Sequence, residues 1–224
     1  MPNIFLTNKY IVTLLTLSVI GGVIGALIAI TQSPKTLLLP VPFTVQDLTG
    51  KWDRNEDCEE ASIAMANAYL GGNKDDKLSA TVAQEYISAL KRWENTNLGY
   101  NADTGAYATS RMAEGTFGIT VRQIRDYTET DLKKELAKNH VILLPINARL
   151  LGNPNYAESG PTYHMIVVRG YNASGFIVND PGTEQGNGQV YSFETLKKSA
   201  ADWNNSAKIM DSTIKIALIL SRWF

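Results

Sequence analysis

The most pronounced hydrophobic pattern lies near the N-terminus, where residues 11–30 read IVTLLTLSVIGGVIGALIAI without a single charge. A helix of this length, rising about 1.5 Å per residue, spans about 30 Å and so matches the hydrocarbon core of a membrane. The apolar core of a signal peptide is shorter, and Ala26 and Ala29 lack the A-x-A spacing of a cleavage site. We therefore predict a retained transmembrane helix at 11–30, preceded by a tail at 1–10.

The flanking charges set an expected orientation for this segment. Lys9 and the terminal amine favour a cytoplasmic N-terminus, against which Lys35 acts on the other side. We predict a single-pass protein of the cell membrane whose following domain is extracytoplasmic. Gly21 and Gly25 have the small-xxx-small spacing that lets two membrane helices approach, so weak self-association is a further expectation, although glycine is common in such helices.

After the apolar segment, residues 31–36 form a polar linker, and the domain is predicted at 37–224. Apolar residues at helical spacing predict a helix at 58–70, with Asp57 as its cap and Gly71 and Gly72 at its end. A second helix is predicted from 81 to about 93, with Thr81 and Gln84 as a capping box. The glycine-bearing stretch 95–118 is expected to be irregular, and a short helix is expected at 130–139.

The C-terminal half is predicted to be mostly sheet. VILLPIN at 141–147 has the pattern of a buried strand, and TYHMIVVRGYN alternates so that His164, Ile166 and Val168 share one face. A turn at 172–175 then leads into FIVND, which predicts an antiparallel hairpin that brings Asp180 near the start of the His164 strand. Further along the chain we expect a strand at 189–193, a helix at 194–203 and a strand at 212–220. Helices followed by an antiparallel sheet predict an α+β domain.

Composition narrows the chemistry. The formal net charge is −1, which gives no electrostatic reason to expect a nucleic acid as partner. Cys58 is the only cysteine, so no disulfide within the chain can form, and the histidines are His140 and His164. One cysteine and two distant histidines do not make a metal ligand set, so neither a metal nor another cofactor is expected.

Cys58 opens the predicted helix at 58–70, and a helix N-terminus and a neighbouring imidazolium are the two devices that activate a thiol. His164 could act as the base, with Asp180 orienting it, and Gln46 could join the backbone N–H of Cys58 in stabilising an oxyanion. Each residue also has an ordinary interpretation. Cysteine is often a small buried hydrophobe, histidine on an apolar strand is often a core residue, and Asp180 precedes the turn-forming Pro181.

Several motifs in order carry a family resemblance: LPVPFTVQ, Cys58 with EEAS behind it, GPTYHMIVVRGY at 160–171, and NDPGT at 179–183. The chain resembles the papain-like cysteine peptidases related to the bacteriocin-processing, double-glycine leader peptidases, from about Leu39 to Trp203. The resemblance implies a papain-like fold with a triad of Cys58, His164 and Asp180, and Gln46 in the oxyanion hole. Glu59 and Glu60, which follow the cysteine, are expected to oppose thiolate formation.

The expected function is thiol-dependent hydrolysis of a bond in a peptide or protein substrate by a membrane-anchored domain without transporter domains. Two alternatives remain open. The same constellation suits an amide hydrolase or acyl transferase that acts on the cell wall, and the fold also suits a peptide-binding domain without activity.

Overall fold

The computed structural model describes residues 34–52, 56–100, 102–157 and 160–222. The predicted tail at 1–10 and the predicted membrane segment at 11–30 lie outside these residues. Within the described part of the chain, no helix is both long enough and apolar enough to cross a membrane. Residues 35–224 belong to one compact unit.

The described helices lie mainly, but not only, in the first half of this unit. They are α2 (Cys58–Leu70), α3 (Ala80–Asn97), α4 (Ala106–Phe117), α5 (Glu129–Leu136) and α6 (Phe193–Ser199), with a 3₁₀ turn at Ala148–Leu150. Nearly every side chain of α2 is buried, so it lies inside the protein rather than on its surface. Its Ala61, Ala64 and Ala68 belong to one hydrophobic cluster with Ala83 and Ile87 of α3, where small side chains let the two helices pack closely.

The strands lie mainly in the second half of the unit. They are β1 (Leu37–Leu38), β2 (Thr120–Arg125), β3 (Val141–Ile146), β4 (His164–Asn172), β5 (Gly175–Asn179), β6 (Asn187–Tyr191), β7 (Asp202–Asn204), β8 (Ile209–Asp211) and β9 (Ile216–Ser221). Among the described residues a seven-stranded antiparallel sheet has the order β2-β9-β3-β4-β5-β6, with β1 added beside β4. Strands β7 and β8 form a separate hairpin.

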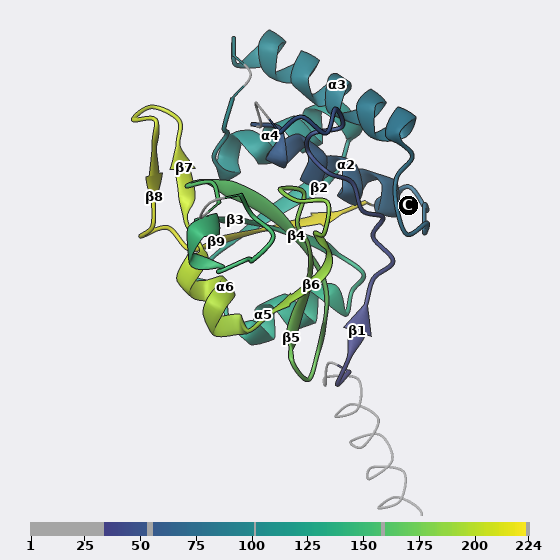
Figure 1. Cartoon of the computed structure of the whole chain (residues 1–224), viewed down its shortest axis with the longest axis vertical. Helices are drawn as coiled ribbons and strands as arrows, with labels where there is room; N and C mark the ends of the chain where they lie inside the picture. The colour runs from purple at the N-terminus through teal and green to yellow at the C-terminus, as the bar shows by residue number, and fades with distance from the viewer. Residues whose placement is uncertain (1–33, 53–55, 101, 158–159, 223–224) are drawn as a thin grey trace, which may run out of the picture. The chain divides into compact units, whose positions relative to one another are not determined.

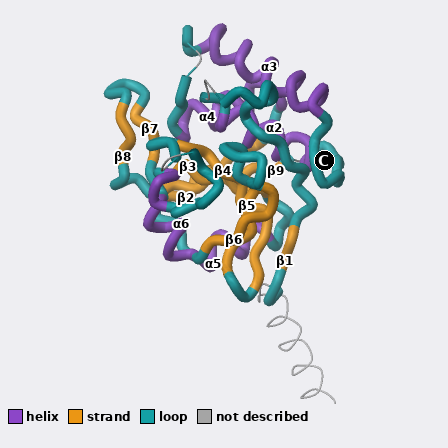
Figure 2. Tube along the Cα trace, in the orientation of Figure 1, coloured by secondary structure: helices purple, strands orange, loops and turns teal. Residues whose placement is uncertain are grey.

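The sheet is covered on both faces. All six residues of β3 are buried, which requires side chains packed above and below this central strand. Figure 1 shows α2, α3 and α4 grouped on one side of the sheet, and α5 and α6 on the other. In Figure 2 the orange strands lie between these two groups of purple helices. The α+β class predicted from the sequence is therefore confirmed, with helices packed on both faces of an antiparallel sheet.

The helix predicted at 58–70 is confirmed, but its predicted cap is wrong. Asp57 stands at the cap position and makes no capping hydrogen bond with its side chain. Its carboxylate instead accepts two hydrogen bonds from Lys91 of α3, at 2.6 and 2.7 Å. An ion pair with the neighbouring helix thus takes the place of the local cap.

Other boundaries also differ from the predictions. Helix α3 begins one residue earlier than expected because Ser79 accepts from the N–H of Val82, so the capping box predicted at Thr81 and Gln84 is wrong. The stretch 95–118, expected to be irregular, contains the end of α3 and the whole of α4. The helix predicted at 194–203 ends at Ser199. The strands β1, β2, β7 and β8 were not predicted.

Candidate active site

His164 is the first residue of β4, and its side chain is only 1% exposed. It pairs with Ile146 of β3, while Asn179 of β5 pairs with Val167 on the other edge of β4. This register carries Asp180, the residue after β5, back to the start of β4. The Nε2 atom of His164 lies 2.7 Å from Oδ1 of Asp180. The structure therefore brings these two predicted residues together.

Asp180 is fully buried and surrounded by donors. Besides His164, it accepts from the Tyr156 hydroxyl at 2.5 Å, the Asn153 amide at 3.1 Å and the N–H of Gly182 at 2.9 Å. Burial by itself would raise the pKa of this carboxyl. The charge and hydrogen bond of His164, together with the Tyr156 and Gly182 donors, outweigh burial, so the pKa of Asp180 lies below its ordinary value. The carboxylate is held ionised.

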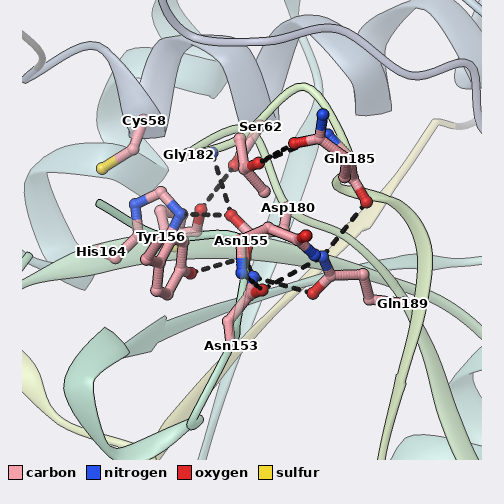
Figure 3. Close-up of polar contacts among 12 residues, drawn as sticks. Cys58, Ser62, Asn153, Asn155, Tyr156, His164, Asp180, Gly182, Gln185 and Gln189 are labelled. Carbon is pink, nitrogen blue, oxygen red and sulfur yellow. Dashed lines mark hydrogen bonds and ion pairs between the residues drawn. The ribbon is translucent and has the colours of Figure 1, made fainter. Parts of the chain in front are cut away.

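Two of these donors, Asn153 and Tyr156, were not predicted as site residues. Both lie in the segment between the 3₁₀ turn and β4, where no periodic pattern marks them. The Tyr156 ring also packs edge-on against the His164 ring, with centroids 6.0 Å apart. Tyr156 and Asn153 thus fix Asp180, and Tyr156 also supports the imidazole (Figure 3).

Gly182 closes the turn over the imidazole. A Cβ at this position would lie 2.9 Å from both Cε1 and Nε2 of His164, closer than side-chain carbons normally approach other atoms. The glycine therefore allows the backbone to pass directly over the ring while its N–H still reaches Asp180. Only a residue without a side chain fits both requirements.

Cys58 is the first residue of α2, as predicted, and is 2% exposed. One turn later, the Ser62 hydroxyl donates to the carbonyl of Met165 at 3.3 Å, which anchors α2 on β4 immediately beside His164. Figure 3 shows the Cys58 sulfur on the side of the imidazole that faces away from Asp180. Because Nε2 of His164 is engaged by Asp180, Nδ1 is the nitrogen that remains for the thiol.

Acidic groups surround the thiol. Its S–H donates to Oε2 of Glu59 at 3.0 Å. Burial raises the pKa of Cys58 well above its ordinary value, and the charges of Glu59 and Asp103 add to this effect. The pKa of Glu59 is itself raised to about 8, first by burial and then by Asp103. The expectation that carboxylates beside the cysteine oppose thiolate formation thus agrees with these electrostatics.

Cys58, Glu59 and Asp103 have potential ligand atoms within 4.8 Å of one another. Both oxygens of Glu59 are already engaged, because Oε1 accepts from the N–H of Thr104 at 2.6 Å and Oε2 accepts from the thiol. These contacts tie Glu59 to the thiol on one side and to the backbone before α4 on the other.

Gln46 is buried. Its backbone N–H donates to the carbonyl of Pro181, which attaches the segment that carries Gln46 to the turn after Asp180. It lines a cavity of about 590 Å³ together with Trp52, Tyr156, Gly160 and Gly182. Tyr156 packs edge-on against the imidazole and Gly182 lies over it, so this cavity borders the His164–Asp180 pair, although His164 does not line it. Cys58 does not line this cavity in the described structure.

His140 lies elsewhere. Its Nδ1 is 2.8 Å from Oε2 of Glu135, a carboxylate that also binds Arg122 and Lys138. This histidine therefore belongs to a polar cluster around Glu135 of α5, and the structure does not bring it to Asp180.

Comparison with known proteins gives a family. The model of the Peptidase_C39 like family matches residues 38–210. Among solved structures, a protein designated as a C39-like peptidase from Bacillus anthracis is similar in fold, with a TM-score of 0.56 and 15% identity over 85% of this chain and 99% of that chain. A cysteine protease from Carica candamarcensis has a TM-score of 0.43 and 10% identity over 84% of this chain and 99% of that chain. No curated protein matches.

Proposed function

Because the chain belongs to the Peptidase_C39 like family, we propose that it is a cysteine peptidase with Cys58 as nucleophile and His164 as base. The observation that carries this proposal is the buried His164–Asp180 pair, 2.7 Å apart, beside the helix that begins at the only cysteine. A paired imidazole next to a thiol at a helix N-terminus is the arrangement that nucleophilic catalysis by cysteine requires.

The proposed steps are those of a Cys-His-Asp triad. The thiol proton moves to Nδ1 of His164 while Sγ attacks the substrate carbonyl carbon. Asp180 accepts from Nε2–H throughout, which fixes the tautomer and stabilises the imidazolium. The N–H of Cys58 and the amide of Gln46 stabilise the oxyanion. His164 then gives the proton to the leaving amine, and a water that His164 deprotonates releases the acyl group from sulfur.

The test is hydrolysis of a peptide library by the purified chain and its variants. Cys58→Ala and His164→Ala should each abolish turnover almost completely, because nucleophile and base act as one unit. Asp180→Asn should cause a large but smaller loss. In serine proteases the same change costs about 10⁴-fold, and we expect a thiolate–imidazolium pair to depend less on its third member.

His140→Ala is the matched control, since this second histidine is engaged by Glu135 away from the site. Its activity should stay within about twofold of the wild type. Loss of activity in His140→Ala together with retention in His164→Ala would overturn the assignment of the base. Products from peptidoglycan but from no peptide would instead indicate a cell-wall amide hydrolase or acyl transferase. Binding of peptides without any turnover would indicate a non-catalytic domain.

We also propose that residues 11–30 anchor the peptidase in the cell membrane with the domain outside the cytoplasm. This proposal rests on the length and lack of charge of that segment. Membrane fractionation and protease protection of intact cells test it. Intact chain in the soluble fraction, or a domain protected in the cytoplasm, would contradict it.

A further inference from the structure

Glu59 is a buried acid that the proposed reaction does not use. Its side chain is 1% exposed, and it lies directly beside the nucleophile on α2. Oε2 accepts from the Cys58 thiol at 3.0 Å, and Oε1 accepts from the N–H of Thr104 at 2.6 Å. Thr104 is fixed in turn, because its carbonyl accepts from the Tyr163 hydroxyl at 2.8 Å. The Thr104 contact therefore holds the carboxyl group of Glu59 in place on one side, while its other oxygen faces the sulfur.

The groups that face the thiol are mostly acidic. From α2 these are Glu59 and Glu60, and from the segment before α4 it is Asp103. Glu60 shares a hydrogen bond with the buried Glu94 of α3, and its charge is the weakest of the three on the thiol. From the start of β4 come Tyr163 and His164. Lys208 acts on Asp103.

We propose that ionised Glu59 is a brake on Cys58: it accepts the thiol hydrogen bond, disfavours the thiolate and releases the thiol to His164 when it is itself protonated. The inference rests on the proposed peptidase function and adds a positioning residue to it. An ionised carboxylate 3.0 Å from the sulfur opposes a second negative charge there. A protonated carboxyl carries no such charge, and its O–H can donate to the thiolate once the thiol proton has moved to Nδ1 of His164.

The pH at which the brake acts follows from the environment of Glu59. Burial raises the pKa of Glu59 to about 8, so the carboxylate forms mainly above neutral pH. The brake should therefore be weak at pH 6 and strong at pH 9. In an ordinary thiol peptidase the thiolate becomes more abundant over this range, so the two effects oppose each other.

Glu59→Gln in the full chain tests this inference. Glutamine keeps the acceptor for Thr104 and an N–H donor toward the sulfur, but it cannot ionise. Because Cys58 is the only cysteine, the rate of iodoacetamide alkylation reports this thiol alone. With EDTA present, the ratio of the variant rate to the wild-type rate should rise from about one at pH 6 to about tenfold at pH 9, which corresponds to a thiol pKa lowered by about one.

Two further variants serve as controls. Glu60→Gln removes a neighbouring buried acid whose charge acts on Cys58 more weakly than those of Glu59 and Asp103, so its ratio at pH 9 should rise clearly less than that of Glu59→Gln. Glu59→Asp keeps the charge near Cys58 and should remain closer to the wild type than Glu59→Gln. Thiolate absorbance measured against pH gives the same comparison without a reagent that must reach the buried sulfur, and circular dichroism checks the fold.

The outcomes separate the brake from the peptidase function. A Glu59→Gln ratio that does not change with pH in a folded protein, or a lower thiol reactivity at pH 9, would overturn the brake even where Cys58→Ala abolishes peptide hydrolysis. A pH-dependent gain in thiol reactivity would support the brake even if no peptide were hydrolysed, in which case only the peptidase function would fail.

Discussion

The buried carboxyl of Glu59 should make the protein less stable as the pH rises, and Glu59→Gln should remove this loss. In the folded chain the pKa of Glu59 rises from its ordinary 4.5 to about 8, chiefly through burial. Below about pH 4.5 the group is protonated in both states and has no effect. Between 4.5 and 8 the unfolded chain ionises while the folded chain stays protonated, so the free energy of unfolding falls with pH and levels off above about 8.

The size of the effect follows from the pKa difference. Each pKa unit corresponds to about 1.4 kcal/mol, so Glu59 should cost on the order of 3 kcal/mol at pH 7 and on the order of 5 kcal/mol above pH 8. Urea unfolding followed by tryptophan fluorescence at pH 4.5, 7 and 8.5 measures this. Glu59→Gln should match the wild type at pH 4.5 and exceed it by these amounts at higher pH.

Glu85→Gln is the matched control, because Glu85 is exposed on α3 and its replacement should change stability by less than about 0.5 kcal/mol at every pH. The reasoning would be refuted by a difference between Glu59→Gln and wild type that is the same at all three pH values. It would also be refuted by a variant less stable than the wild type at pH 8.5.

Further outcomes are expected at and around the site. Tyr156→Phe removes the donor that lies 2.5 Å from Asp180 and should lower kcat/KM about tenfold. Because the loss of this hydrogen bond raises the pKa of Asp180, the acidic limb of the pH profile of kcat/KM should shift to higher pH. Gly182→Ala places a Cβ 2.9 Å from the imidazole and should lower kcat/KM about 100-fold in a protein whose circular dichroism is unchanged. Residues 37–224 expressed alone should give a cooperative melt as a monomer; an aggregated or molten product would mean that a further segment completes the core.

Local patterns predicted the elements that carry the site. The Gly71-Gly72 pair marks the end of α2, and the alternation from His164 with its turn at 172–175 gives the β4–β5 hairpin. These signals lie within the elements themselves, so the sequence sufficed. The pairing of His164 with Asp180 followed from the hairpin, although the bulge between Val168 and Gly170 and the exact register required the structure.

Where the predictions failed, distant contacts decide the conformation. Gly115 looks like a helix breaker, but it lies inside α4. A Cβ at this position would fall 2.2 Å from Nε1 of Trp93, so the glycine is needed there to let α4 pack against α3. Helix α6 stops at Ser199 because the backbone beyond it joins the end of β3: the Asn147 N–H donates to the Ser199 carbonyl, and the Ala201 N–H donates to that of Pro145. Neither contact leaves a periodic signal in the sequence.

The site also contains two buried carboxyls whose surroundings act in opposite directions. Asp180 receives four hydrogen bonds, one of them from His164, and these keep its pKa below the ordinary value despite burial. Glu59 accepts fewer hydrogen bonds than Asp180, and its charged neighbour Asp103 is itself an acid. Burial therefore prevails, and the pKa of Glu59 rises. One carboxylate therefore stays ionised and orients the imidazole, whereas the other gains or loses its proton near the pH at which the thiol must react. Environment rather than residue type thus assigns the two roles, as in enzymes that use paired carboxyls with separated pKa values.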